Sequence, residues 1–124
     1  MPSINKRIAT IHIADLKLRA VIGVNEWEKR KRQNIIITAM IEYDATRAVK
    51  SDHVRDAMDY KKVKQSIIQL IKKNHYQLLE KLVAAVLDLI MRNPKVIRAN
   101  VRIDKPLALR FAQSVAIEMN SRQR

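Results

Sequence analysis

The stretch Ile8–Ile22, with the sequence IATIHIADLKLRAVI, decides the fold class because apolar and polar residues alternate along it. The alternation runs to Ile13, breaks at Ala14–Asp15 and resumes at Leu16. A period of two is the pattern of a β-strand with one buried face, and the break indicates a bulge or a bend. We therefore predict a long strand here, ended by Gly23.

Three further stretches have the character of strands, namely Ile35–Tyr43, Val96–Asp104 and Ser114–Met119. The first of them is rich in Ile, Thr and Tyr, which favour strands. It is separated from the opening strand by the polar and charged segment Asn25–Asn34, which predicts a loop. A loop of this kind between two neighbouring strands indicates antiparallel pairing.

Two helices are predicted between the second and third strands. Tyr60–Lys73 carries one apolar stripe at helical spacing, and Asp59 before it is a suitable N-cap. Leu78–Arg92 is apolar at the same spacing, and Asn93–Pro94 stops it. The segment between the second strand and Asp59 is polar, with a turn or cap signal at Ser51–Asp52.

The predicted order is strand, strand, helix, helix, strand, strand. This order favours an α+β fold in which a four-stranded antiparallel sheet carries two helices on one face. A chain of 124 residues without a linker or repeat fits a single domain, residues 1–124.

The chain is strongly basic, with 25 Lys and Arg against 12 Asp and Glu and a formal net charge of +13. Such a charge suits nucleic acid, an anionic membrane or small anions such as phosphates. Aromatic residues make up only 4%, and zinc-finger spacing and RNA-binding motifs are absent, so we expect no nucleic-acid partner. A basic nucleic-acid-binding module is kept as a remote alternative.

Several other functional classes are disfavoured by composition. There is no cysteine, and the three histidines have no ligand spacing, so no metal site is expected. The single glycine, Gly23, cannot build a phosphate-cradling or dinucleotide-binding loop. No apolar run is long enough to span a membrane, and no signal peptide is apparent, which makes a cytoplasmic protein without a membrane partner the default expectation.

Lys105 and Glu80 are candidates for chemistry, and each also has a structural interpretation. Lys105 precedes Pro106, which favours extended backbone at the end of the third strand, so it is either a surface lysine or a catalytic amine. Glu80 lies near the start of the second helix, where a carboxylate favours the helix dipole. The same carboxylate could accept two parallel N–H bonds from a guanidine-like heterocycle edge.

Tyr60 and Glu28 are the other two candidates. Tyr60 opens the first helix, where it either covers the edge of the core or stacks on a flat heterocycle and transfers a proton. Glu28 lies in a polar loop before the basic run Lys29–Arg32. This loop is either solvated or supplies a carboxylate for a substrate hydroxyl and cations for a phosphate.

Four short motifs occur in the order and spacing of a known family. They are Ile22-Gly23-Val24 followed by Glu26-Trp27-Glu28 and Gln33; Asp56 to Tyr60; Leu78-Leu79-Glu80; and Val101 to Pro106. Through them the chain resembles the dihydroneopterin aldolases and dihydroneopterin triphosphate epimerases from Ile11 to Met119. The resemblance implies the tunnelling fold, in which the sheets of several subunits join into a barrel ring. It also implies a homo-octamer of two stacked rings with active sites between subunits.

The resemblance implies a role for each site residue. Lys105 is then the general acid and base, and Tyr60 of an adjoining subunit stacks on the pterin and transfers protons. Glu80, helped by the backbone at Leu79, binds the pterin ring, and Glu28 lies near the substrate side chain. No cofactor is implied, because the dihydropterin C=N itself accepts electrons and neither a Schiff base nor a metal is required.

The resemblance leaves two activities open. Ala108–Val115 and Leu16–Ile22 are more similar to the epimerase branch, whereas Trp27 is more similar to the aldolase branch. Arg110 and the run Lys29–Arg32 could hold a triphosphate. On these residues we favour an aldehyde-lyase of folate biosynthesis that cleaves 7,8-dihydroneopterin and also epimerises it, with the triphosphate 2'-epimerase as the alternative.

Overall fold

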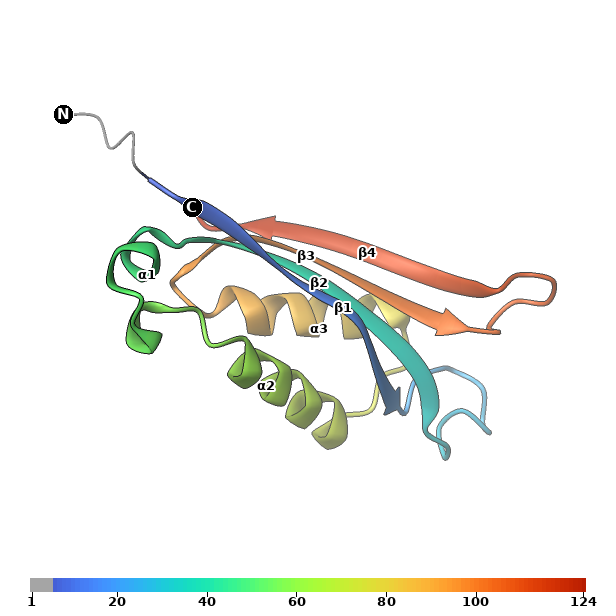
Figure 1. The fold of residues 1–124 in the computed structure, drawn as a ribbon. Coiled ribbons are helices and arrows are strands. Elements are labelled where there is room, and N and C mark those ends of the chain that lie inside the picture. The colour runs from blue at the N-terminus through green and yellow to red at the C-terminus, as the bar shows by residue number, and fades with distance from the viewer. Residues whose placement is uncertain (1–5) are drawn as a thin grey trace.

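The computed structural model describes residues 6–124, and its strands form one four-stranded antiparallel sheet in the order β1-β2-β3-β4 (Figure 1). The strands are β1 (Ile8–Ala20), β2 (Gln33–Asp44), β3 (Val96–Pro106) and β4 (Ser114–Arg122). The helices are α1 (Thr46–Ser51), α2 (Tyr60–Lys73) and α3 (Leu79–Met91), with a 3-10 turn at Val54–Asp56. Both α2 and α3 lie on one face of the sheet, which confirms the predicted α+β class.

β1 contains the predicted bulge. The register steps from Ile13 opposite Ala39 to Leu16 opposite Ile37, and Asp15 takes a positive φ of 54°. The additional residue keeps the apolar side chains on the helix-covered face on both sides of the bulge. β1 ends before the predicted Ile22, because the chain there leaves β2 and forms a separate parallel bridge with Tyr76.

The two long helices agree closely with the prediction. α2 has the predicted bounds, and the Asp59 side chain caps it by accepting a hydrogen bond from the backbone N–H of Lys62 at 3.0 Å. The predicted second helix included Leu78 and Arg92, which the structure assigns as the caps of α3. Helix ends differ by a residue or two between criteria, so this difference is small.

The polar connection before Asp59 is more ordered than the sequence indicated. It contains α1, which has no buried residue and therefore no apolar stripe that periodicity could detect. The turn signal at Ser51–Asp52 is confirmed, since Asp52 ends α1 in the left-handed conformation with φ of 53°.

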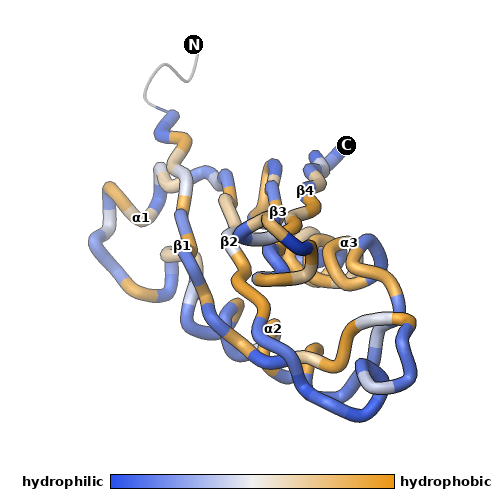
Figure 2. The backbone as a smooth tube through the Cα atoms, turned by 90° about the vertical axis from the view of Figure 1, so that its right-hand side faces the viewer, coloured by the Kyte–Doolittle hydropathy of each residue, from blue (hydrophilic) through white to orange (hydrophobic). Residues whose placement is uncertain are grey.

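The core lies between the sheet and the helices. Figure 2 shows that α3 and the middle of β2 are largely hydrophobic. On β2, Ile35, Ile37, Ala39 and Ile41 are completely buried, and the residues between them face the other side of the sheet. The same alternation on β3 buries Val101 and Ile103 and determines where the residues after them point.

Candidate active site

A buried ion pair joins the end of β3 to the loop after β1. Lys105 Nζ lies 2.6 Å from Glu28 Oε2, and the two side chains are only 16% and 7% exposed. A hydrogen bond between charged groups at this distance is among the stronger polar contacts in proteins. The structure thus brings together two of the predicted site residues that are far apart in the sequence.

The alternation of β3 explains why Lys105 points toward the helix-covered face. Val101 and Ile103 are in the core, so Lys105 follows them on the same face, and it is paired in register with Val115. Pro106 ends the strand, and its ring favours an extended backbone at Lys105. Lys105 is therefore held by a paired strand rather than by a loop.

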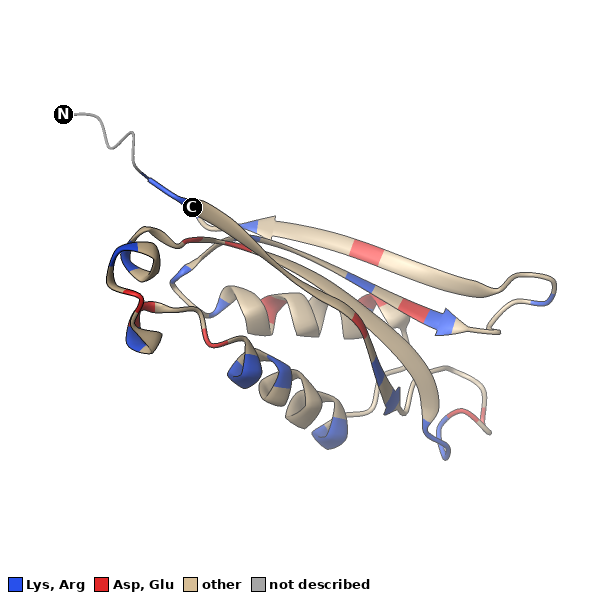
Figure 3. Cartoon of the chain, in the orientation of Figure 1, with Lys and Arg blue, Asp and Glu red and all other residues tan. Residues whose placement is uncertain are grey.

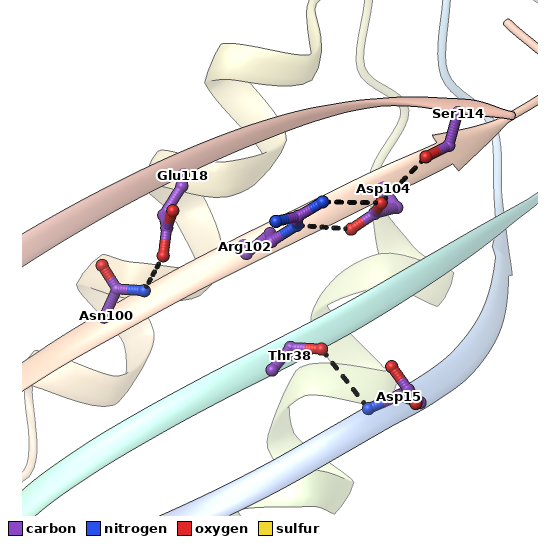
Figure 4. Close-up of polar contacts among 7 residues, drawn as sticks. All are labelled: Asp15, Thr38, Asn100, Arg102, Asp104, Ser114 and Glu118. Carbon is purple, nitrogen blue, oxygen red and sulfur yellow. Dashed lines mark hydrogen bonds and ion pairs between the residues drawn. The ribbon is translucent and has the colours of Figure 1, made fainter. Parts of the chain in front are cut away.

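The neighbouring residue Asp104 points to the opposite face of the sheet. There it accepts hydrogen bonds from Arg102 Nε at 2.9 Å and from Ser114 Oγ at 3.0 Å (Figure 4). The bond from Arg102 lowers the pKa of Asp104, and the bond from Ser114 lowers it further while burial opposes both. This network ties the ends of β3 and β4 together directly beside Lys105.

Glu28 is the only charged residue among those buried in the described part of the chain, with 5% exposure. Its Oε1 accepts the backbone N–H of Asn25 at 3.1 Å, and its Oε2 accepts Gln33 Nε2 at 3.4 Å as well as Lys105. The hydrogen bond from Lys105 lowers the pKa of Glu28 below 4.5, although burial acts in the opposite direction. The carboxylate is therefore ionised at neutral pH and neutralises the lysine.

Leu79 and Glu80 lie at the same end of the molecule as this pair. In space, the start of α3 lies at the same end of the sheet as the end of β3 (Figure 1). The segment before α3 is joined to the chain after β1 by the bridge between Ile22 and Tyr76. Leu79 packs against the core, whereas Glu80 is exposed in the first turn of α3. Among residues 6–124 no hydrogen bond joins Glu80 to Lys105 or Glu28.

Tyr60 is not brought to this end of its own chain. It opens α2, whose 14 residues span about 20 Å at the usual helical rise, and α2 starts at the end near α1 (Figure 1). Its side chain is 56% exposed. A single subunit therefore separates Tyr60 from Lys105, and the predicted stacking role would need the Tyr60 of another subunit.

Arg110 lies in the exposed loop between β3 and β4. The backbone N–H of Leu107 donates to the carbonyl of Gln113 at 3.0 Å and closes this loop. The Arg110 guanidinium lies 5.3 Å from the ring centre of Phe111, which is itself 99% exposed. Arg110 is itself exposed, so its guanidinium is accessible to a ligand from solvent.

Positive charge is concentrated outside this pair as well. α2 carries five lysines at positions 61, 62, 64, 72 and 73 and no acidic residue (Figure 3). A hollow of about 690 Å³ between α2 and α3 is lined by Lys62, Lys73, polar side chains and the apolar side chains of Ile68, Leu70 and Leu89, and none of the predicted site residues lines it. In residues 6–124 no group of three His, Asp or Glu side chains could hold a metal, and no helix is long and apolar enough to cross a membrane.

Sequence reasoning missed the residues that support Glu28. Asn25 and Gln33 donate hydrogen bonds to it, and Gly23 provides the space that its carboxylate occupies. Gln33 and Gly23 belong to the motifs quoted above, but their role follows only from the folded loop. A buried glutamate within a charged segment gives no periodic signal, because this loop is irregular.

Comparisons with known proteins identify the family. The family model described as FolB, dihydroneopterin aldolase, matches residues 11–120. The chain is 40% identical over 119 residues to the dihydroneopterin triphosphate 2'-epimerase of Pseudomonas aeruginosa, covering 96% of this chain and 97% of that protein. It is 26% identical over 107 residues to the dihydroneopterin aldolase of Haemophilus influenzae, covering 86% and 91%.

Solved structures share the fold. A crystal structure from Vibrio cholerae described as a dihydroneopterin aldolase superposes with a TM-score of 0.88 at 30% identity, covering 93% of this chain and 98% of that one. Escherichia coli dihydroneopterin aldolase, solved in complex with neopterin, gives a TM-score of 0.86 at 22% identity, covering 91% and 98%. The four-stranded sheet with its two covering helices is thus the tunnelling fold, and the chain belongs to the dihydroneopterin aldolase (FolB) family.

Proposed function

We propose that the chain is an epimerase that inverts C2' of 7,8-dihydroneopterin triphosphate by reversible retro-aldol cleavage. Identity favours this substrate, because the epimerases of Pseudomonas aeruginosa and Escherichia coli are 40% and 42% identical, against 26% and 23% for the aldolases of Haemophilus influenzae and Escherichia coli. This reverses the order that the sequence motifs suggested. The net charge of +13 also suits a triphosphate.

The buried pair of Lys105 and Glu28 is the observation that carries the chemistry. Lys105, an ammonium in its ion pair with Glu28, gives a proton through water to the ring nitrogen of the dihydropterin C=N, and the amine that results takes the proton of the 2'-hydroxyl. The ionised Glu28, 2.6 Å away, stabilises the ammonium that forms again. The C1'–C2' bond breaks, its electron pair forms a C=C bond between C1' and the ring, and the electron pair of the C=N bond moves to the ring nitrogen, which holds the added proton. The products of this step are an enamine and an aldehyde that still carries the phosphate chain.

The fate of the enamine decides which activity is seen. If its C1' attacks the opposite face of the aldehyde, the C1'–C2' bond forms again and C2' is inverted. The new alkoxide takes a proton from Lys105, and the ring nitrogen returns its proton to Lys105 as the C=N bond forms again. If C1' is protonated instead, both fragments leave. One pair of residues thus supports epimerisation and cleavage, and retention of the aldehyde by cations such as Arg110 favours the first outcome.

The remaining site residues bind the pterin in this proposal. Both carboxylate oxygens of Glu80 accept hydrogen bonds, one from the 2-amino group of the pterin and one from a ring N–H, and the backbone at Leu79 helps to bind the ring. In this proposal Tyr60 comes from the adjoining subunit of a homo-octamer, because Tyr60 and Lys105 of the same subunit lie at opposite ends of the molecule. The exposure of both Glu80 and Tyr60 supports a site completed by a neighbour.

The test is to supply purified protein with 7,8-dihydroneopterin triphosphate and separate the C2' isomers by chromatography. We expect the inverted isomer to accumulate until both isomers are at equilibrium. Lys105→Ala should lower turnover by about 100-fold or more while pterin affinity persists, as is usual for loss of a general acid and base. Lys64→Ala, a change at an exposed lysine of α2, is the matched control and should leave turnover intact. Unchanged turnover in Lys105→Ala would refute the assigned role.

Cleavage of 7,8-dihydroneopterin is a second candidate activity. It is favoured by the aldolase family model over residues 11–120 and by the 30% identity to the Vibrio cholerae structure described as an aldolase. The same preparation is therefore assayed for release of 6-hydroxymethyl-7,8-dihydropterin and glycolaldehyde. If cleavage is faster than inversion, the aldolase reaction is the main activity. If neither the cleavage products nor the inverted isomer form, both proposals are refuted.

A further inference from the structure

We propose, on the basis of the function proposed above, that Gly23 is a positioning residue that determines where the Glu28 carboxylate meets Lys105. It is the only glycine in the chain. It does not touch the reacting atoms in this proposal and acts on turnover through Glu28.

The first observation is the space above Gly23. A Cβ atom at this position would lie 2.2 Å from Glu28 Cδ and 2.4 Å from each carboxylate oxygen. Nonbonded atoms cannot approach so closely, so any side chain at position 23 must displace the carboxylate or the backbone. The carboxylate that pairs with Lys105 therefore occupies the volume that a side chain would fill.

The second observation is the backbone of Gly23. Its φ is +135°, a conformation that is open to glycine and strained for residues with a Cβ. In this conformation its N–H donates to the carbonyl of Tyr76 at 3.0 Å, and the N–H of Tyr76 donates to the carbonyl of Val21 at 3.0 Å. These two bonds attach the segment before α3 to the end of β1.

The same short segment also orients Gln33. The Gln33 Nε2 donates to the carbonyl of Ile22 at 2.6 Å and to Glu28 Oε2 at 3.4 Å. Residues 21–23 are thus bonded to the support of Glu28 on one side and to the start of α3, which carries Glu80, on the other. Gly23 lies where the acid–base pair and the predicted pterin-binding carboxylate are fixed relative to each other.

Displacement of Glu28 has a defined consequence. The ionised carboxylate would leave its place between Asn25 and Lys105, and Lys105 would lose its counterion. A misplacement of about 1 Å at a catalytic group can lower the rate by about 100-fold. Loss of kcat with little change in pterin affinity is therefore the expected signature of Gly23→Ala, since Glu80 itself is not altered.

The test is a double-mutant cycle with Gly23→Ala, Glu28→Gln and the double variant. Because glutamine has nearly the volume of glutamate, the steric conflict with a Cβ at position 23 remains in the double variant. We expect Gly23→Ala to lower kcat by about 10- to 100-fold in the wild-type background and by less than about 3-fold in the Glu28→Gln background. Equal losses in both backgrounds would overturn the inference, because Gly23 would then act independently of Glu28.

A matched control and a rescue variant keep the outcome clear if Gly23→Ala folds poorly. Val24→Ala changes the adjacent, 58% exposed residue and should leave kcat and the melting temperature nearly unchanged. Glu28→Asp withdraws the carboxylate by about one C–C bond, or about 1.5 Å, and should raise the melting temperature of the Gly23→Ala variant. Failure of Glu28→Asp to restore stability in this background would contradict the steric basis of the inference.

A readout that needs no turnover separates this inference from the proposed function. In wild type the ¹³C resonance of the Glu28 carboxyl should titrate below pH 4.5, and in Gly23→Ala its midpoint should move upward toward that value. If wild type turns over neither substrate but this shift occurs, the proposed reaction fails and the positioning inference stands. An unchanged Glu28 titration in Gly23→Ala overturns the inference whatever the activity.

Discussion

Replacing Glu28 by glutamine should destabilise the protein by removing the counterion of a largely buried lysine. At 2.6 Å and an effective dielectric constant of about 20, the gross attraction of the pair is about 6 kcal/mol, most of which is offset by desolvation. Removing one partner of a fully buried pair costs about 3–5 kcal/mol, and exposed pairs contribute about 0.2–1 kcal/mol. Because the pair lies at a strand end near solvent, we expect a loss of about 2 kcal/mol at neutral pH.

The pH dependence gives this prediction its sharpest form. Since the hydrogen bond from Lys105 lowers the folded pKa of Glu28 below 4.5, its contribution is fully present above about pH 4.5. The contribution is lost as the pH falls through the lower folded pKa. The difference in stability between wild type and Glu28→Gln should therefore be about 2 kcal/mol at pH 7 and should shrink in acid.

The assay is urea denaturation of both proteins at pH 7 and at about pH 3, at equal protein concentration because self-association affects stability. Glu80→Gln is the matched control, since Glu80 is exposed and its substitution should have a much smaller effect at either pH. A difference between wild type and Glu28→Gln that is equal at both pH values would refute the reasoning. It would mean that the substitution acts through packing rather than through the charge of Glu28.

Three further predictions concern separate parts of the molecule. Asp59→Ala removes the N-cap of α2 and should lower the free energy of unfolding by about 1 kcal/mol in urea denaturation; an unchanged midpoint would contradict the cap. Glu80→Ala removes a bidentate acceptor and should weaken pterin binding by about 10- to 100-fold in a fluorescence titration, whereas equal affinity would exclude Glu80 as the anchor. Arg110→Ala should raise KM for dihydroneopterin triphosphate by about 3- to 10-fold and leave KM for dihydroneopterin unchanged, and an equal rise for both would show that Arg110 does not contact phosphate.

Periodicity was sufficient to predict the sheet and the two long helices. The alternation along β1 even located the bulge at Ala14–Asp15, because one additional residue reverses the facing of every later side chain. Asp59 was predicted as the cap of α2 from its residue type alone, and its hydrogen bond to Lys62 confirms this. α1 was not predicted, since a short helix that buries nothing leaves no apolar pattern.

The predicted site residues had a different basis. Lys105 and Glu28 were candidates from residue type and position, and the family resemblance gave them their roles. Their contact joins positions 77 residues apart, which no local pattern specifies. The support from Asn25 and Gln33 depends on the fold of an irregular loop, for which the sequence offers no period to follow. The role of Tyr60 remains a prediction because it requires a second subunit.

The bulge in β1 has a consequence for the behaviour of the protein in concentrated solution. β1 is an edge strand, and its outer row of backbone donors and acceptors is a template on which further strands could add. Asp15, with its positive φ, interrupts this row and divides the edge into the shorter segments Ile8–Ile13 and Leu16–Ala20. A flat foreign strand can pair with only one of these segments at a time, so the bulge restricts this edge to strands whose shape matches it and limits non-specific aggregation.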